Sequence, residues 1–262
     1  MGNHNSLEEV SNERNFLDEL CGCDSDRKPS KIRAKLGTNH PFLSAVATGD
    51  LEYLKLLLLF DSNLIRTVKD GNGNSAAHVA AANGRTRELE YLLNLDPWLI
   101  EAVNDVKNTP VHSAADNGHV SVLQLLIARS PEAALAKGAM GATPAHLAAA
   151  KGHLEAVRFL HESNPSALTA RDRRGSTAAH YAALHGHAHV LRLACAARPA
   201  AVHDANGDGD TPAHLAAAAG RSEALRAILE LDAGAAAVAN AAGARPVDVA
   251  GSDACKQLLL NR

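Results

Sequence analysis

The chain alternates between short stretches of small apolar residues and longer stretches whose large apolar residues recur at helical spacing. Residues 144–151 (PAHLAAAK) show the first pattern and follow Thr143, whose hydroxyl is suited to cap a helix. Leu154, Val157 and Leu160 show the second pattern, since residues three positions apart share one face of an α-helix. The pattern therefore predicts a short, closely packed helix and then an amphipathic one.

Glycine and proline separate these segments. Gly152 is expected to end the first helix, because glycine tolerates the left-handed conformation at a helix exit. Pro165 is expected to stop the second helix, because proline cannot continue the backbone hydrogen-bond ladder. Residues 168–175 are polar and turn-like and lead to the next capping residue, Thr177. One unit of the chain is therefore two helices followed by a loop.

This unit recurs with a period of 34 residues. Five boxes of the form Ser/Thr-Pro/Ala-x-His contain histidines at that spacing: His78, His112, His146, His180 and His214. A glycine follows each of them six residues later: Gly84, Gly118, Gly152, Gly186 and Gly220. Leu43 and Asp248 occupy the histidine position in an outer unit at either end, giving seven units. Because neither helix of a unit can bury its apolar face alone, stacked units are predicted to form a solenoid.

The box with its glycine turn resembles the ankyrin repeat, and the chain lacks the W-x₂-L-G pattern of the tetratricopeptide repeat. The resemblance covers residues 38–262 and implies an all-α, ankyrin-repeat solenoid of stacked helix-turn-helix units with hairpin loops on one side. The units depart from the usual 33 residues, and loops such as residues 96–99 (DPWL) replace the usual Gly-Ala turn. Residues 1–37 do not share the repeat. The last unit stops soon after residues 258–260, so its second helix is expected to be short.

Composition narrows the classes of function. The net charge of −3 provides no global basic field, so no nucleic-acid partner is expected. Apolar residues reach 46% and aromatic residues only 3%, which suits small helices that approach closely. Four irregularly spaced cysteines favour a reducing, cytoplasmic compartment. The most hydrophobic stretch, residues 54–60, is too short to span a membrane, and we expect a monomer.

Fourteen histidines raise the question of metal binding or catalysis. The five box histidines are predicted to be structural, because each can hydrogen-bond to its own box hydroxyl and to the adjoining loop. Residues 185–189 (HGHAH) lack a cysteine or carboxylate partner at a zinc spacing. Residues 204–209 (DANGDG) begin like a calcium loop, but Leu215 stands where a bidentate glutamate is needed. Without a catalytic motif either, the sequence predicts no metal, no cofactor and no enzyme.

Loop tips and inner helices of such a solenoid form an extended concave surface, and the resemblance implies that this surface binds another protein. The expected contact residues run from an amide-rich end, through a basic patch, to an acidic end. In chain order they are Asn72, Asn74, Asn83, Asp105, Lys107, Asn108, Asp116, Asn117, Met140, Lys151, Arg173, Arg174, Leu184, His185, Asp208 and Asp210. Few aromatic anchors, which usually dominate binding hot spots, appear among them.

The first six residues, MGNHNS, match the N-myristoylation motif M-G-x-x-x-[ST], with Gly2 as the acceptor. One acyl chain binds membranes only marginally, so a second signal is needed. Cys21 and Cys23 are candidate acylation sites. A basic run that an anionic membrane surface would attract follows them: Arg27, Lys28, Lys31, Arg33 and Lys35. The alternative is a solvated linker whose charges are balanced by neighbouring carboxylates.

Residues 6–20 are compatible with either a short amphipathic helix or a disordered segment. Ser6 and Glu9 can cap a helix, and its weak apolar stripe consists of Leu7, Val10, Leu17 and Leu20. The whole sequence favours a non-catalytic adaptor that is held at a cytoplasmic membrane face through N-myristoylation and recruits another protein. Two alternatives stay open: a soluble scaffold or inhibitor with an inert tail, and a bacterial effector delivered into a eukaryotic cell and lipidated there.

Overall fold

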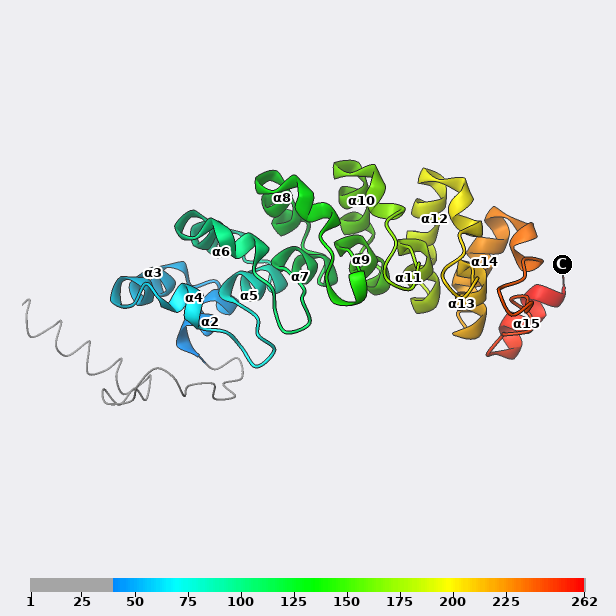
Figure 1. Cartoon of the computed structure of the whole chain (residues 1–262), viewed down its shortest axis with the longest axis horizontal. Helices are drawn as coiled ribbons and strands as arrows, with labels where there is room; N and C mark the ends of the chain where they lie inside the picture. The colour runs from blue at the N-terminus through cyan, green and yellow to red at the C-terminus, as the bar shows by residue number, and fades with distance from the viewer. Residues whose placement is uncertain (1–39, 262) are drawn as a thin grey trace, which may run out of the picture.

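The computed structural model describes residues 40–261, whose regular structure is helical apart from one bridge between Lys69 and Ser75. The first helices of the units, here called inner helices, line the concave side of an arched stack (Figure 1): α2 (Pro41–Thr48), α5 (Ala76–Ala82), α7 (Pro110–Asp116), α9 (Pro144–Lys151), α11 (Ala178–His185) and α13 (Pro212–Ala218). The outer helices line the convex side: α3 (Leu51–Phe60), α6 (Thr86–Leu95), α8 (Val120–Arg129), α10 (Leu154–Ser163), α12 (Ala188–Ala197) and α14 (Ser222–Leu231). The predicted all-α solenoid is confirmed.

The helix boundaries around His146 follow the sequence signals. α9 spans Pro144–Lys151, the predicted residues, and Gly152 exits it in the left-handed conformation with φ 75°. α10 ends at Ser163, before Pro165. Thr143 caps α9 through a capping box, in which the third helical residue is the box histidine. Because these signals are local in the chain, the pattern predicted both helices.

The loops after the outer helices contain short helical turns, which the sequence pattern did not predict. Most are single 3₁₀ turns, and η4 lies inside a hairpin: η2 (Pro97–Glu101), η3 (Pro131–Leu135), η4 (Ala139–Gly141), η5 (Pro165–Leu168), η6 (Pro199–His203) and η7 (Ala233–Ala236). In the first unit a short helix, α4 (Leu64–Thr67), occupies this place. Proline suits the first helical position, and a preceding Asp or Asn caps η2, η5 and η7. Asp96, for example, accepts from the Trp98 amide at 3.3 Å.

The core is built from two kinds of side chain. Inner helices contribute alanines that are fully buried, such as Ala145, Ala148 and Ala149 in α9. Outer helices contribute leucines at helical spacing, such as Leu123 and Leu126 in α8, which are also fully buried. The small alanines let neighbouring inner helices pack closely, and the leucines fill the space between the two rows. Each unit therefore depends on its neighbours for burial.

A second set of histidines connects each outer helix to the preceding unit. The Nε2 atoms of His119, His153 and His187 donate to backbone carbonyls 37 residues earlier, at 2.9, 3.0 and 2.9 Å. Arg85 and Arg221 make the corresponding bond in other units. Each of these side chains lies over the turn glycine of the preceding unit. The sequence showed that the three histidines share a place in the repeat, but their role is visible only in the stack.

Gly118→Ala is expected to lower the free energy of unfolding by about 3 kcal/mol, because two costs combine. Gly118 has φ 71°, where a Cβ is strained, and a Cβ here would lie 2.7 Å from the His153 ring. Gly243→Ala is the matched control, since Gly243 has φ 79° with nothing within 4 Å of its Cβ position. Urea denaturation followed by circular dichroism should give about 1 kcal/mol for the control. Equal losses of unfolding free energy in Gly118→Ala and Gly243→Ala would show that the contact with the His153 ring contributes nothing.

The final unit departs from the others. Residues 246–249 form turns where the other units have an inner helix. Asp248 replaces the box histidine, and its carboxylate accepts from the Arg245 amide at 2.8 Å. The closing helix, α15 (Asp253–Leu260), has eight residues where α14 has ten, so the predicted shortening is confirmed. Across residues 40–261, no helix has both the length and the apolar character needed to cross a bilayer.

Candidate functional site

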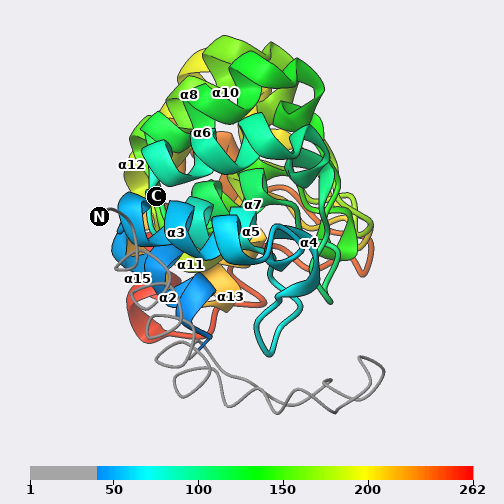
Figure 2. The ribbon, with the colours of Figure 1, turned by 90° about the vertical axis from the view of Figure 1, so that its left-hand side faces the viewer.

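Hairpins between the units project together on one side of the helices (Figure 2). Five of them begin with an Asp or Asn whose side-chain oxygen accepts from two backbone amides of the same hairpin: Asp70, Asn104, Asp172, Asn206 and Asn240. Such Asx turns fix the local backbone without help from the rest of the fold. The hairpin tips are therefore held in defined positions.

Neighbouring hairpins are also bonded to one another. The Arg173 amide donates to the Met140 carbonyl at 3.0 Å, and the Gly207 amide donates to the Arg174 carbonyl at 2.7 Å. Bonds of the same kind join Asp105 to Asn72 and Ala241 to Asp208. The second and third hairpins are joined instead by the Asn108 side chain, which accepts from the Ala139 amide. Together these bonds place the tips side by side along the array.

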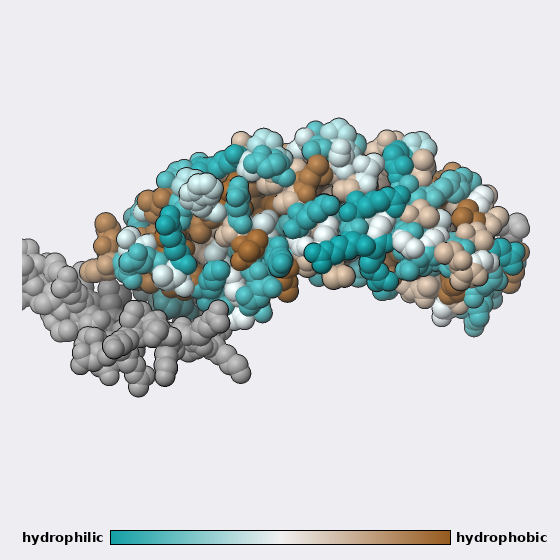
Figure 3. All heavy atoms as spheres, in the orientation of Figure 1, coloured by the Kyte–Doolittle hydropathy of each residue, from teal (hydrophilic) through white to brown (hydrophobic). Residues whose placement is uncertain are grey.

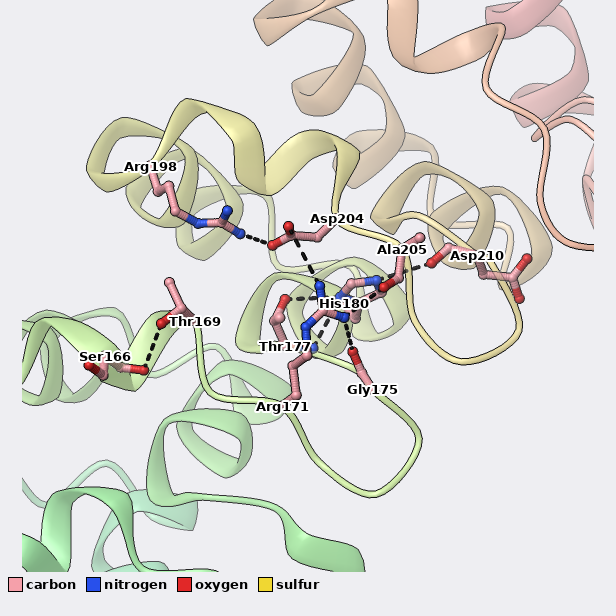
Figure 4. A network of polar contacts seen from close by, with 10 residues as sticks. All are labelled: Ser166, Thr169, Arg171, Gly175, Thr177, His180, Arg198, Asp204, Ala205 and Asp210. Carbon is pink, nitrogen blue, oxygen red and sulfur yellow. Dashed lines mark hydrogen bonds and ion pairs between the residues drawn. The ribbon is translucent and has the colours of Figure 1, made fainter.

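The box histidines connect the inner helices to this row of hairpins by hydrogen bonds. His180 Nδ1 lies 2.9 Å from the Thr177 hydroxyl, and its Nε2 lies 3.1 Å from the Asp210 carbonyl of the next hairpin (Figure 4). His78, His112, His146 and His214 make the same two kinds of contact. A carbonyl only accepts, so Nε2 of His180 carries the proton, and Nδ1 accepts from the Thr177 amide at 3.1 Å, so the ring is neutral. Burial lowers the pKa of His180 to about 4, which keeps it neutral at physiological pH.

The third hairpin has a different construction. Gly138 stands where an Asp or Asn begins the other hairpins, and the Asn108 side chain of the preceding hairpin supplies the acceptor for the Ala139 amide at 2.9 Å. Met140 at the tip has φ 52° and is 58% exposed. Val106, at the same place in the second hairpin, is 56% exposed. Two adjacent tips therefore present apolar side chains to solvent.

The fourth hairpin carries the cationic pair Arg173 and Arg174, both exposed. Asp172 at its base is buried, and its second carboxylate oxygen accepts from the Tyr181 hydroxyl of α11 at 2.9 Å. Burial and this carboxylate raise the pKa of Tyr181 to about 12, so the hydroxyl stays a donor. The bond ties the hairpin to the inner helix. Arg174 Nη2 lies 3.6 Å from the Asp208 carboxylate, a weak exposed pair that leaves its charge accessible.

In the segment that resembles the start of a calcium loop, residues 204–209, the first carboxylate already pairs with arginine side chains. The Asp204 carboxylate pairs with Arg198 and lies 3.9 Å from Arg171 Nη2 (Figure 4). Arg171 Nη1 also donates to the carbonyls of Gly175 and Ala205, both at 2.7 Å. No cluster of potential metal ligands occurs in residues 40–261. Burial raises the pKa of Cys195 to about 11, so its thiol is not an activated nucleophile.

Comparison with known proteins identifies this architecture. A family model of ankyrin repeats in three copies matches residues 42–135, 95–172 and 132–202, together more than half of the chain. The chain belongs to the ankyrin repeat family. Arrays of this family are interaction modules that use the extended concave surface, so binding of another protein is the function that the family supports.

Individual relatives agree with this assignment. The E3 ubiquitin-protein ligase XB3 of Oryza sativa subsp. japonica is 39% identical over 79 residues, which are 29% of this chain and 17% of that protein. The chain therefore spans only a small part of this curated relative. The crystal structure of the human ASB11 ankyrin repeat domain matches with a TM-score of 0.71 at 24% identity, covering 85% of this chain and 98% of that one. That likeness shows the fold.

The ankyrin array places the sequence-predicted contact residues in three groups. The first group consists of three side chains that accept hydrogen bonds from a neighbouring hairpin. Asn74 accepts from the Asn104 side chain, and Asp210 accepts from the Asn240 side chain. Asn108 accepts from the Ala139 backbone amide. The tips expose Asn72, Asp105, Lys107, Met140, Arg173, Arg174 and Asp208. The exit ends of the inner helices expose Asn83, Asn117, Lys151, Leu184 and His185, with Asp116 half-buried beside them. The predicted lipidation and basic residues lie outside the described range: Gly2, Cys21, Cys23, Arg27, Lys28, Lys31, Arg33 and Lys35.

Sequence reasoning missed several exposed apolar residues of the array. Val106 lies at a hairpin tip, and Trp98, in η2, is 74% exposed. Hydrophobic patches are visible over the N-terminal half of the molecule, and hydrophilic surface extends across its middle (Figure 3). The signal for Val106 was its register, since it shares the tip position with Met140. No comparable signal marked Trp98, because the repeat pattern alone does not tell which loop residues stay uncovered.

Proposed function

We propose that this ankyrin protein is a non-catalytic adaptor whose hairpin tips and concave surface bind a protein partner. The observation that carries the proposal is the sequence of side chains at successive bonded tips: apolar at Val106 and Met140, then cationic at Arg173 and Arg174. An apolar centre supplies most binding energy, and neighbouring charges set orientation and partner choice. The partner chemistry that fits is an exposed apolar side chain next to carboxylates.

Rigidity supports the same proposal. The Asx turns, the inter-hairpin bonds and the Asp172–Tyr181 contact hold these tips before any partner arrives. A preorganised surface avoids the conformational entropy that ordering loops on binding would cost. The tips therefore suit a specific interface.

Arg173→Glu with Arg174→Glu is expected to weaken partner binding about tenfold or more, because reversal puts like charges against the partner's carboxylates. Both side chains are exposed, so folding should be retained. Arg87→Glu with Arg226→Glu makes the same charge change on the exposed surface of outer helices and is the control. Affinity capture with quantitative mass spectrometry would compare proteins recovered with each variant. Equal recovery by both double variants would refute the assignment of the patch.

We also propose that residues 1–37 form a separate targeting segment before the array of residues 38–262, and that it holds the adaptor at a cytoplasmic membrane face. The support is the coincidence of the Gly2 motif, the pair Cys21 and Cys23, and the basic run that begins at Arg27. Two membrane signals are what stable anchoring needs.

Coexpression with a eukaryotic N-myristoyltransferase is expected to add one myristoyl group at Gly2, visible as an intact-mass gain of about 210 Da on the acceptor motif. Sedimentation with anionic liposomes should depend on Gly2, and Gly2→Ala is the control. An unmodified wild-type mass would reject the lipid anchor and leave the adaptor proposal intact, since that rests on the array.

A further inference from the structure

The outer helix of the first unit exposes an apolar face. In α3, Leu59 is 83% exposed, Phe60 44% and Leu56 40%. The other large apolar residues of this helix, Leu54, Leu57 and Leu58, are buried against the array. α3 is therefore apolar on two sides, although only one of them has a partner within the described residues.

The equivalent positions of later outer helices indicate the role of the exposed side of α3. α3 and α6 are both ten residues long and lie 35 residues apart, so Leu56 corresponds to Tyr91 and Phe60 corresponds to Leu95. Tyr91 and Leu95 line a groove of about 450 Å³ together with Leu59 of the preceding unit, so Leu59 lies on the side of α3 that faces α6, and Leu56 and Phe60 mark the uncovered side. In α8, α10 and α12 the residues at the position of Leu56 are half-buried and packed against the core: Leu125, Phe159 and Leu193. The exposed side of α3 is thus a stacking face.

End units of solenoids normally present a polar outer face, because nothing stacks on them. The array does not follow this rule at its N-terminal end. α2 and α3 lie together at that end of the stack (Figure 2), and Pro41 begins α2. The chain segment before Pro41 is therefore attached beside the uncovered face.

We propose that residues 6–20 of the same chain bind this face as an amphipathic helix and complete the first unit. Their apolar stripe, Leu7, Val10, Leu17 and Leu20, would lie on Leu56 and Phe60. Fifteen helical residues span about 22 Å, longer than the ten-residue α3. The 19 residues of 21–39 reach up to ~60 Å, which is ample for return to α3.

The tether is the reason to prefer this occupant over a separate molecule. A segment joined by a short linker has an effective concentration in the millimolar range, so even a modest apolar contact is populated. The polar residues of the segment, including Glu8 and Glu19, would face solvent and supply the polar outer surface that a capping element needs. The proposal is independent of the lipid anchor and of the hairpin surface.

Hydrogen exchange with mass spectrometry on the full chain tests this contact. Leu17→Asp with Leu20→Asp is expected to speed amide exchange in α3 about fivefold or more, because the covering contact is lost. Ser11→Asp with Asn15→Asp adds the same charge off the apolar stripe and should leave exchange unchanged. In the reciprocal experiment, Leu56→Asp should speed exchange of residues 6–20, and circular dichroism would verify that the array stays folded.

Two results would overturn the proposal. One is equal exchange of α3 in the wild type and in both double variants, since the segment then does not cover the helix. The other is protection of α3 that disappears on dilution, with a dimer seen by light scattering, because a second copy would then occupy the face. Either result leaves the hairpin-surface proposal unaffected.

Discussion

Replacing His146 by alanine is expected to lower the free energy of unfolding by about 4 kcal/mol. The imidazole is fully buried and connects two units. Its Nδ1 lies 2.8 Å from the Thr143 hydroxyl and 3.0 Å from the Thr143 amide, and its Nε2 lies 2.9 Å from the Ser176 carbonyl. Alanine leaves a cavity and removes the partners of these buried groups. Loss of a buried hydrogen-bond network is among the costliest single changes.

The destabilisation by His146→Ala should be confined to the units that meet at this residue. Each unit contacts only its neighbours, so the substitution weakens the junction between the third and fourth full units. Hydrogen exchange should accelerate most in α9 (Pro144–Lys151) and in the hairpin that contains Ser176.

Urea denaturation followed by circular dichroism would measure the loss. His185→Ala is the control, since His185 is an exposed histidine of the same array, and it should change stability by less than about 0.5 kcal/mol. A similar loss for both variants would show that the box hydrogen bonds contribute little.

Acidification from pH 6.5 to pH 5 is expected to destabilise the array while its carboxylates are still largely charged. Burial lowers the pKa of both His112 and His180 to about 4, and it also lowers the pKa values of His78 and His146. In the unfolded chain these groups titrate near 6.5. Below that value the unfolded state binds more protons than the folded state, so stability falls as the pH falls. The penalty grows from pH 6.5 and is complete below about pH 4.

The size of this effect follows from the two pKa values. Lowering a pKa from 6.5 to about 4 corresponds to about 3 kcal/mol for each of His112 and His180 at the acid end, and to about 2 kcal/mol for each at pH 5. Urea denaturation at pH 7, 6 and 5 would measure the slope. His112→Gln with His180→Gln should be less stable at pH 7 and should show a shallower slope. A flat wild-type profile between pH 7 and 5 would contradict the neutral, buried state of the box histidines.

Helix boundaries and repeat register could be predicted because their causes lie within a few residues of one another. Thr143 and Pro144 specify the start of α9, and Gly152 specifies its end. The loops after the outer helices were harder, since Pro165 both ends a helix and begins the 3₁₀ turn η5. At the end of the array, the chain around Asp248 forms turns instead of an inner helix. Asp248 closes only a local turn with Arg245, so no box histidine bonds the segment to a following hairpin.

Some residues of the candidate surface could be recognised from the sequence, and the role of others is visible only in the structure. The basic pair Arg173 and Arg174 was recognisable from its position in the repeat. Asn74, Asn108 and Asp210 occupy equally plausible positions, and only the stack shows that their side chains bond to neighbouring hairpins. Hydrogen bonds between units join residues about 30 positions apart, and a pattern read within one unit does not show which of two polar neighbours becomes the partner.

The sequence by itself determined the unit, its period, its caps and the family, because capping, helical periodicity and glycine turns act over short distances in the chain. The tertiary structure alone decided which side chains stay uncovered. Leu56 of α3 is exposed, yet Tyr91 at the equivalent position of α6 is half-buried and packs against the core. Leu59 of α3 is among the most exposed apolar residues of the array. Exposure depends on whether another unit stacks on a face, which is a property of the neighbours and not of the segment.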